Sequence, residues 1–567
     1  MLLIGSCTPQ HRAAEAIRIR WAHDPETLDP LALHNQSAMD ASNLLHMGLL
    51  QADSAPLAIV PALAAQLPIM GRRGDSLTTF RYTLRPTASW DDGHPVLAAD
   101  VACTLKLMNC PGLPNEVVRQ RFGIIRQIEL DSLNPRSFTL VCQGTAPELL
   151  ITSGDFFVLP EAVLDAHYRL RRYSLPQLQQ LAPAAPTDSV LQAVARRYLA
   201  LDLANRPGQL PGCGAYQLVG WVKDHSLSFQ RKTRWWGQAV AGLPLSLQPR
   251  APRLEYVVLP TPSAATLALR RGDLDVFPQI PATDFDHLRA AADPALRLYT
   301  SDSYDVAVAG FNTRHPALAD ARTRQALSRL FDTAGLLRAT QHGSGHRTAS
   351  LVPPFDRANY NDSLQPVPFD PAGARRLLRQ AGWQPPTARQ RSWQRATPRG
   401  TQQLQLLLRY RAEDNVFATA ALQFRAAATQ LGIAVELRPT ESAAFGKTLA
   451  QGDFDLYLRT LRGNPFNNDL TPLLHSASSR ETNPTGFGTP ACDRLLVAIA
   501  STAATPRRTR QLRQLQALLQ QEAPLVPLFF LPNRVAARRN LTGLYVSSLK
   551  PGFVAATIER TASAARR

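Results

Sequence analysis

The chain has 567 residues, 45% hydrophobic and 19% charged. This length exceeds what one hydrophobic core usually organises, so two or three domains are expected. The formal net charge is +18, but the basic residues are spread along the chain rather than gathered in a run interleaved with aromatics. Nucleic-acid binding is therefore only a remote alternative. No apolar run reaches the roughly 20 residues that cross a bilayer, and the longest, 523–532, predicts a buried strand.

The first residues contain a candidate lipidation site. The stretch Leu3-Ile4-Gly5-Ser6-Cys7 resembles the signal box of bacterial lipoproteins, in which small residues precede the cysteine that is lipidated. A signal peptide needs a longer apolar stretch than precedes Cys7 here. Either the true start lies upstream or this cysteine is incidental, and we expect the former. Residues 1–16 are thus predicted to be a signal remnant and tether, with Cys7 as the lipid anchor.

The first half of the chain predicts short strands separated by turns. Ile17–Trp21 alternates as a strand, and Phe80–Leu84 is a second strand, followed by the turn Trp90-Asp91-Asp92-Gly93. Residues 181–187, with two prolines, are typical of a surface loop.

The second half predicts clearer α/β units. Asp370 and Pro371 suit the start of a helix whose apolar stripe ends before Gly382, and the polar, proline-containing segment 384–400 predicts a loop. Next, 404–410, 416–431 and 433–437 have the order strand, helix, strand, which implies parallel pairing through a crossover helix.

One short pattern occurs twice. A helix predicted at Ser263–Arg271 runs into Gly272-Asp273-Leu274-Asp275, and a second helix runs into Gly452-Asp453-Phe454-Asp455. In each copy a new strand follows. Two copies about 180 residues apart indicate two α/β lobes of related construction, and clefts between such lobes commonly bind small ligands.

Nothing in the sequence indicates catalysis, a metal or a cofactor. The chain lacks the spacing of a zinc protease, a nucleophile elbow or a phosphate-binding loop. Its six cysteines include no Cys-x-x-Cys pair. If Cys7 is lipidated, five remain, and their pairing stays open. We therefore predict a protein that is not an enzyme.

With these motifs in order, the chain resembles the extracellular solute-binding proteins of family 5, which serve peptide, dipeptide and nickel ABC importers. The resemblance runs from about residue 17 to 550 and rests on loose motifs that follow the family's order. These are 80–85 with 90–95 and 99–101, Gly212-Cys213-Gly214-Ala215-Tyr216 with Trp235-Trp236-Gly237, 310–326, 372–383, 483–496 and 524–528. Cys213 and Ala215 replace the family's usual Thr and Pro.

The resemblance implies an α/β, bilobed periplasmic-binding-protein-like fold of type II, cluster C, with an extra inserted domain. Lobe I would comprise 17–49, 208–300 and 520–560, the inserted domain 50–207, and lobe II 301–519. Such proteins close over their ligand by hinge motion.

It also implies a function. The chain would be a monomeric, exported substrate-binding lipoprotein of the periplasm or cell envelope, held to the membrane by its lipid alone, that captures oligopeptides or peptide-like solutes between its lobes. It would deliver them to the ABC permease subunits, without cofactor, metal or nucleic acid. The same fold with a non-peptide solute, such as a nickel chelate, haem or an oligosaccharide, is the alternative, because fold does not settle ligand.

The resemblance implies a site in lobe II. Segments Ser303–Asn312 and Leu456–Asn464 are placed to pair with an extended ligand, and the candidate ligand-binding residues are Tyr304, Asn312, Arg459, Arg462 and Asn464. Peptide-binding members often hold the ligand's free amine with an aspartate where this chain has Asn464, and Leu461 replaces a tryptophan. Arg459 and Arg462 would suit an acidic or carboxylate-bearing ligand better.

Overall fold

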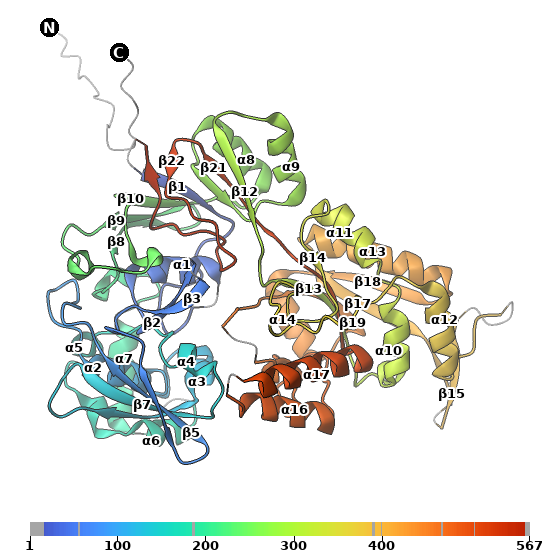
Figure 1. Cartoon of the computed structure of the whole chain (residues 1–567), viewed down its shortest axis with the longest axis horizontal. Coiled ribbons are helices and arrows are strands. Elements are labelled where there is room, and N and C mark those ends of the chain that lie inside the picture. Colours follow the sequence, from blue (N-terminus) through green and yellow to red (C-terminus); the bar gives the residue numbers. More distant parts are fainter. Residues whose placement is uncertain are drawn as a thin grey trace, which may run out of the picture. The chain divides into compact units, whose positions relative to one another are not determined.

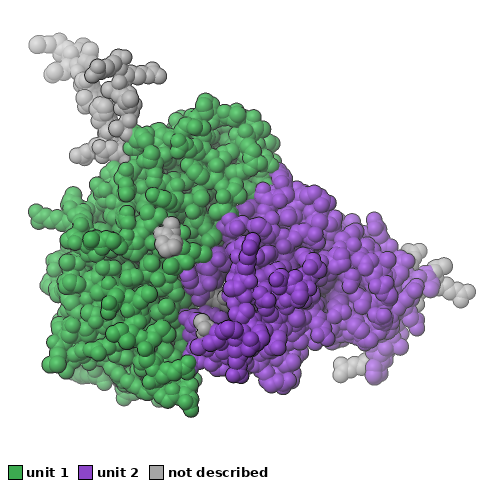
Figure 2. Space-filling view, viewed as in Figure 1, with its two compact units in different colours: residues 1–144, 149–301, 533–567 green, residues 145–148, 302–532 purple. Residues whose placement is uncertain are grey.

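The chain folds into two compact units. The computed structural model describes residues 16–561 except 34, 55–56, 184–187, 388–391, 399, 467–468 and 504. Unit 1 takes the described residues within 1–144, 149–301 and 533–567, and unit 2 those within 145–148 and 302–532 (Figure 2). Cys7 and most of the predicted tether lie outside the described residues.

The main sheet of unit 1 is built from distant parts of the chain. Among the described residues it has seven strands in the order β12-β21-β11-β1-β10-β9-β8. Its strands are β1 (Ala16–Trp21), β8 (Tyr216–Val222), β9 (Ser226–Arg231), β10 (Arg253–Val258), β11 (Val276–Pro278), β12 (Leu296–Ser301) and β21 (Asn533–Arg538). β1 runs parallel to β10 and β11, whereas β21 lies antiparallel between β11 and β12.

Helices cover both faces of this sheet (Figure 1). On one face, apolar side chains of α1 (Gln36–Leu45) pack with Ile17 and Ile19. On the other, α8 (Pro262–Arg271) and α9 (Ala282–Ala291) pack against Phe277 and neighbouring strand residues.

A four-stranded antiparallel sheet also belongs to unit 1, in the order β4-β5-β7-β6. Its strands are β4 (Ile69–Arg73), β5 (Leu77–Thr83), β6 (Ile125–Leu130) and β7 (Ser137–Gln143), and smaller pairings join β2 (Leu50–Ser54) to β3 (Leu57–Pro61) and β22 (Leu541–Thr542) to β23 (Glu559–Arg560). The accompanying helices are α2 (Ala98–Leu107), α3 (Glu116–Phe122), α4 (Leu149–Thr152), α5 (Glu161–Leu164), α6 (Leu175–Gln180) and α7 (Ser189–Ala200). Apart from β22 and β23, these elements fall within 50–207, and that this stretch is a separate inserted domain stays a prediction.

Unit 2 is a sheet between two layers of helices. Its strands follow the order β14-β20-β13-β19-β17-β18. They are β13 (Val306–Phe311), β14 (His346–Arg347), β17 (Gln405–Arg411), β18 (Ala434–Thr440), β19 (Leu456–Leu461) and β20 (Leu525–Phe530). The helices α10 (Ala321–Ser328), α11 (Thr333–Gln341), α12 (Pro371–Gln380) and α13 (Asn415–Gln430) pack on one face. The helices α14 (Ser442–Gln451), α15 (Thr471–Leu474), α16 (Pro490–Ala500) and α17 (Pro506–Glu522) pack on the other (Figure 1).

Most predicted elements form close to their expected positions. Asp370 caps α12 by accepting a hydrogen bond from the Gly373 backbone N–H at 2.8 Å. β17, α13 and β18 form the predicted unit, with β17 and β18 parallel. One prediction was wrong: within 384–400, part of the expected loop forms the hairpin strand β15 (Gln394–Thr397), which pairs with β16 (Gly400–Gln403).

The predicted boundary at 519/520 was also wrong. We assigned 520–560 to lobe I, but β20 pairs antiparallel with β13 inside unit 2. The chain therefore returns to unit 1 between Pro532 and Asn533, and leaves it between Ser301 and Asp302. Periodicity predicted the strand correctly but carries no information about which sheet receives it.

The repeated Gly-Asp-x-Asp pattern has the same structure in both units. Gly272 and Gly452 each end a helix with φ of +87° and +77°, a conformation that glycine adopts without a steric cost. The backbone of Asp275 donates to the carbonyl of Arg18, and its carboxylate accepts from the Arg18 N–H, both at 2.9 Å. Asp455 makes the same pair with Leu407, at 2.9 and 2.7 Å. Each aspartate thus ties its strand to a parallel neighbour.

Candidate functional site

Four of the five predicted ligand residues gather at one end of the unit 2 sheet. In the antiparallel pair β13–β19, Val306 lies opposite Leu461, so the residues before β13 and those after β19 share an end. A Cβ built on Gly463 would lie 2.3 Å from the Tyr304 carbonyl oxygen, which shows that the two segments touch. Arg462 and Asn464 therefore flank this contact, and Arg459 precedes it on β19.

Asn312 lies at the opposite end of β13. Its side-chain N–H groups donate to the carbonyls of Phe454 at 3.1 Å and Gly452 at 3.4 Å, while its backbone N–H donates to Asp455. Asn312 is eight residues along an extended segment from Tyr304, or roughly 26 Å away. The structure does not bring Asn312 to the other four residues, and its amide holds the turn before β19 instead.

The main-chain groups of β13 are already used. β13 pairs on one side with β19 and on the other with β20, so most of the segment Ser303–Asn312 has no edge to offer. β17, however, pairs with β19 only at Leu456 and Tyr457. Among the described residues, no strand pairs with the rest of that β19 edge. Of the two predicted segments, an added strand could therefore pair with Leu458–Leu461 and the residues that follow.

Arg459 presents a positive charge near this edge for which the described residues supply no ion pair. It is partly buried beside Val308, its guanidinium lies 5.3 Å from the Tyr457 ring centre, and its Nε has no hydrogen-bond partner among the described residues. Arg462 is exposed, and no ion pair to it forms within the described part of the chain. Two cationic side chains therefore remain available to an anionic group.

Asn464, which the resemblance aligns with an amine-binding aspartate of peptide-binding members, serves a turn. Asn464 is exposed, and its Oδ1 accepts a hydrogen bond from the backbone N–H of Phe466 at 2.8 Å. Asp469, the nearest downstream carboxylate, accepts from the Thr471 N–H at 2.9 Å. Asn464 itself has no carboxylate, and the carboxylate of Asp469 accepts from Thr471 instead.

An aromatic cluster around Tyr304 was missed by sequence reasoning. Phe355 lies edge-on to Tyr304 with ring centres 5.2 Å apart, and it also contacts His346 and Phe530. His346 Nε2 lies 2.7 Å from the carboxylate of Asp302. Burial raises the pKa of Tyr304, and the nearby charges of Asp356 and Asp302 add to the rise. His346 stands in a Gly-Ser-Gly-His stretch with no periodicity that could have revealed this contact.

Two of the motifs, 90–95 and 212–216 with 235–237, contact each other inside unit 1. Asp91 accepts a hydrogen bond from the Gly212 N–H at 2.9 Å and pairs with the buried Lys232, whose Nζ donates to the Gly214 carbonyl. The indole N–H groups of Trp235 and Trp236 both donate to the Cys213 carbonyl, at 3.0 and 2.9 Å. These residues position the loop 212–214.

Metal and membrane sites are not found in the described part of the chain. No group of three or more His, Cys, Asp or Glu residues there could hold a metal ion. None of its helices is long and apolar enough to cross a bilayer. The five cysteines there are buried and form no disulfide.

The chain is similar to proteins that bind peptides and to one that binds a metal complex. The model of the bacterial extracellular solute-binding proteins, family 5, matches residues 58–483. The periplasmic murein peptide-binding protein MppA of Escherichia coli is 23% identical, over 89% of this chain and 86% of its own. The oligopeptide-binding protein AppA of Bacillus subtilis, solved with a nonapeptide, has a TM-score of 0.75 and 16% identity, over 96% and 99% of the two chains. NikZ of Campylobacter jejuni, solved with Ni(L-His), has a TM-score of 0.73 and 17% identity, over 96% and 99%.

Proposed function

From the premise that the chain belongs to the bacterial extracellular solute-binding proteins of family 5, the binding components of ABC transporters, we propose that it captures oligopeptides or peptide-like solutes and delivers them to the membrane permease. The family match and the solved structures confirm the predicted family and the periplasmic-binding-protein-like fold. Because members of this family bind solutes and catalyse no reaction, the chain is not an enzyme.

The observation that carries the peptide proposal is the unpaired edge of β19. An extended peptide satisfies its own backbone by pairing with such an edge, so that affinity depends little on side-chain identity. Leu458–Leu461 offers one, with Tyr304 and Phe355 nearby as an aromatic wall. The murein peptide-binding relative, matched over 89% of this chain, supports the same ligand class.

We further propose that the preferred ligand carries a carboxylate near this edge. Asn464 lacks the charge that strengthens a hydrogen bond to an ammonium group, whereas Arg459 and Arg462 have no carboxylate partner among the described residues. An acidic peptide would supply that partner. A ligand with only a free amine would lose this attraction.

The first experiment is mass spectrometry of the small molecules released from purified, denatured protein, followed by thermal-shift assays of those found. A bound ligand raises the melting temperature by mass action. Peptides that stabilise the protein would support the proposal. A nickel chelate, haem or an oligosaccharide would keep the importer role and replace the ligand class. Stability unmoved by every peptide pool would contradict it.

The charge preference has its own test. Arg462→Ala should weaken binding of a recovered acidic peptide about three- to tenfold, because an exposed charged contact contributes roughly 1 kcal/mol. Arg425→Ala, at an exposed arginine of α13, is the matched control and should leave affinity unchanged. Equal affinity of wild type and Arg462→Ala would remove Arg462 from the site.

We also propose that the chain is exported and held at the cell envelope by a lipid on Cys7. The extracellular family supports export, and the stretch 3–7 supports the anchor. Radiolabelled palmitate should be incorporated into the protein expressed with its upstream sequence, and Cys7→Ser should abolish the label. Persistent labelling of that variant would place the lipid elsewhere.

A further inference from the structure

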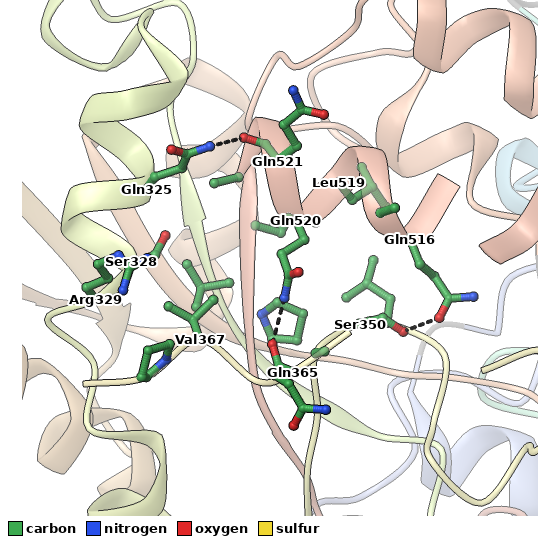
Figure 3. Close-up of a pocket in the computed structure, with 18 of the residues that line it drawn as sticks. Gln325, Ser328, Arg329, Ser350, Gln365, Val367, Gln516, Leu519, Gln520 and Gln521 are labelled. Carbon is green, nitrogen blue, oxygen red and sulfur yellow. Dashed lines mark hydrogen bonds between the residues drawn. The ribbon is translucent and has the colours of Figure 1, made fainter. Parts of the chain in front are cut away.

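Unit 2 contains a pocket of about 370 Å³. None of the residues Leu458–Leu461 of the β19 edge lines it. Its floor is Leu525–Pro527 of β20, which pairs with Val308–Gly310 toward the Asn312 end of β13. Its walls come from α10, from α17 and from the loops around residues 350 and 367 (Figure 3). This volume is within the range of sites that bind small organic ligands.

Hydrogen bonds between the walls of the pocket fix the spacing between them. The side chain of Gln325 on α10 donates to the Gln521 carbonyl on α17, and that of Gln520 donates to the Gln365 carbonyl at 2.8 Å (Figure 3). Gln516 is buried and accepts from the Ser350 hydroxyl at 2.9 Å. Because these contacts join three elements, the helices are not free to move together and fill the space.

The lining is almost free of net charge. Its single charged residue, Arg329, lies 3.2 Å from the carboxylate of Asp370, which also caps α12. A charged ligand would lose hydration on entering and would find no unpaired counter-charge. An uncharged ligand carries no such penalty.

The remaining lining has two chemical characters. One part is apolar and the other is rich in amide side chains, which offer both donors and acceptors. The branched aliphatic residues of the apolar part are Leu351, Val367, Leu377, Leu519, Leu525 and Val526. The amides of Gln365 and Gln521 make no side-chain hydrogen bond to another described residue. These two exposed amides lie on opposite sides of the pocket (Figure 3), so an apolar body with a polar group at the exposed rim fits this division.

We propose that this pocket is an accessory binding site for a small uncharged molecule that has an apolar ring or chain and an amide, hydroxyl or carbonyl group. The site lies wholly within unit 2 and does not depend on the peptide proposal. Its recognition rests on apolar contact with the floor and on hydrogen bonds from the glutamine amides.

A matched pair of probes tests both shape and charge. The probes are 1-naphthaleneacetamide and 1-naphthaleneacetate, which share size and shape but differ in charge. Titrations followed by ligand-observed NMR should show saturable binding of the amide and at least tenfold weaker binding of the carboxylate. Ala517→Trp, at an exposed position of α17 that lines the pocket, should weaken amide binding at least tenfold.

Ala426→Trp provides the control. Ala426 is exposed on α13 of the same unit and does not line the pocket, so this variant should bind the amide as the wild type does. Circular dichroism and melting temperature establish that both variants are folded. The proposal is overturned if the amide does not bind, if folded Ala517→Trp binds it unchanged, or if the carboxylate binds equally well.

Discussion

Asp40 carries a buried carboxyl group of unit 1. Its oxygens accept hydrogen bonds from the Trp21 indole at 3.3 Å and from Gln36 at 2.8 Å. Burial raises its pKa to about 7, although these hydrogen bonds and the charge of Lys550 act in the opposite direction. Because the folded state holds this proton more tightly than the unfolded state, the free energy of unfolding falls as pH rises from about 4 to 7.

Asp40→Asn should remove this dependence. The amide is neutral at every pH, and the partly exposed Gln36 can rotate its own amide to match it. The variant should therefore exceed the wild type in stability at pH 8, by up to about 4 kcal/mol for a pKa of about 7, and differ less at pH 5. Urea unfolding followed by circular dichroism measures the difference. An unchanged difference between the two pH values would show that Asp40 titrates normally.

His46 provides a check of opposite sign. Burial lowers its pKa to about 3, and the charge of Lys232 adds to the decrease. The unfolded state then binds more protons below about pH 6.5, so this residue lowers the unfolding free energy as pH falls. Between about pH 4 and 6.5 the two groups oppose each other, and the wild-type profile should be flatter than that of Asp40→Asn.

At the scale of elements, Asp275 and Asp455 each hydrogen-bond to a parallel neighbouring strand through backbone and carboxylate, a contact called here the aspartate clasp. It makes a matched comparison possible. Asp275 is buried and accepts hydrogen bonds from the Arg18 N–H and, at 2.8 Å, from Arg560. Asp275→Ala leaves both donors without this acceptor and should lower the unfolding free energy by about 3 kcal/mol. Asp273→Ala, two residues away at an exposed position, should change it by less than about 0.5 kcal/mol. Equal effects in denaturant unfolding would show that the clasp is not what stabilises the strand pair.

Elements that follow from local pattern could be predicted, and those that depend on distant pairing could not. The α12 cap, the β17–α13–β18 unit and both Gly-Asp-x-Asp turns follow from residues close in sequence. β20 belongs to unit 2 because it pairs with β13, which is more than 200 residues away in sequence. Likewise, Asn312 shares a segment with Tyr304, but the register of β13 sends them to opposite ends.

The candidate site shows the same limit. Arg459, Arg462 and Asn464 came from the family resemblance and lie near one strand end in sequence, and their role in binding stays a prediction. Asp302, His346 and Phe355 come from three separate segments and meet only through the fold.

At the scale of the whole molecule, one short segment of the first 300 residues belongs to unit 2. Glu148 forms an ion pair with Arg508 on α17, and both side chains are largely buried. Glu148→Gln removes the charge that compensates Arg508 and should lower the unfolding free energy by about 3 kcal/mol. Glu116→Gln, at an exposed position of α3, should have little effect. Calorimetry of both variants distinguishes a stabilising ion pair from an incidental one. If the pair is incidental, the melting temperature of neither variant will change.

The position of β21 in the sheet determines when unit 1 can be finished during synthesis. β21 lies between β11 and β12, and among the described residues β12 has no other partner in that sheet. A ribosome that has released residues 1–301 has therefore made most of unit 1 but cannot join β12 to it. All of 302–532 must emerge first, so unit 2 can close while the main sheet of unit 1 still lacks β21. That sheet is completed only when residues 533–538 insert between strands made hundreds of residues earlier.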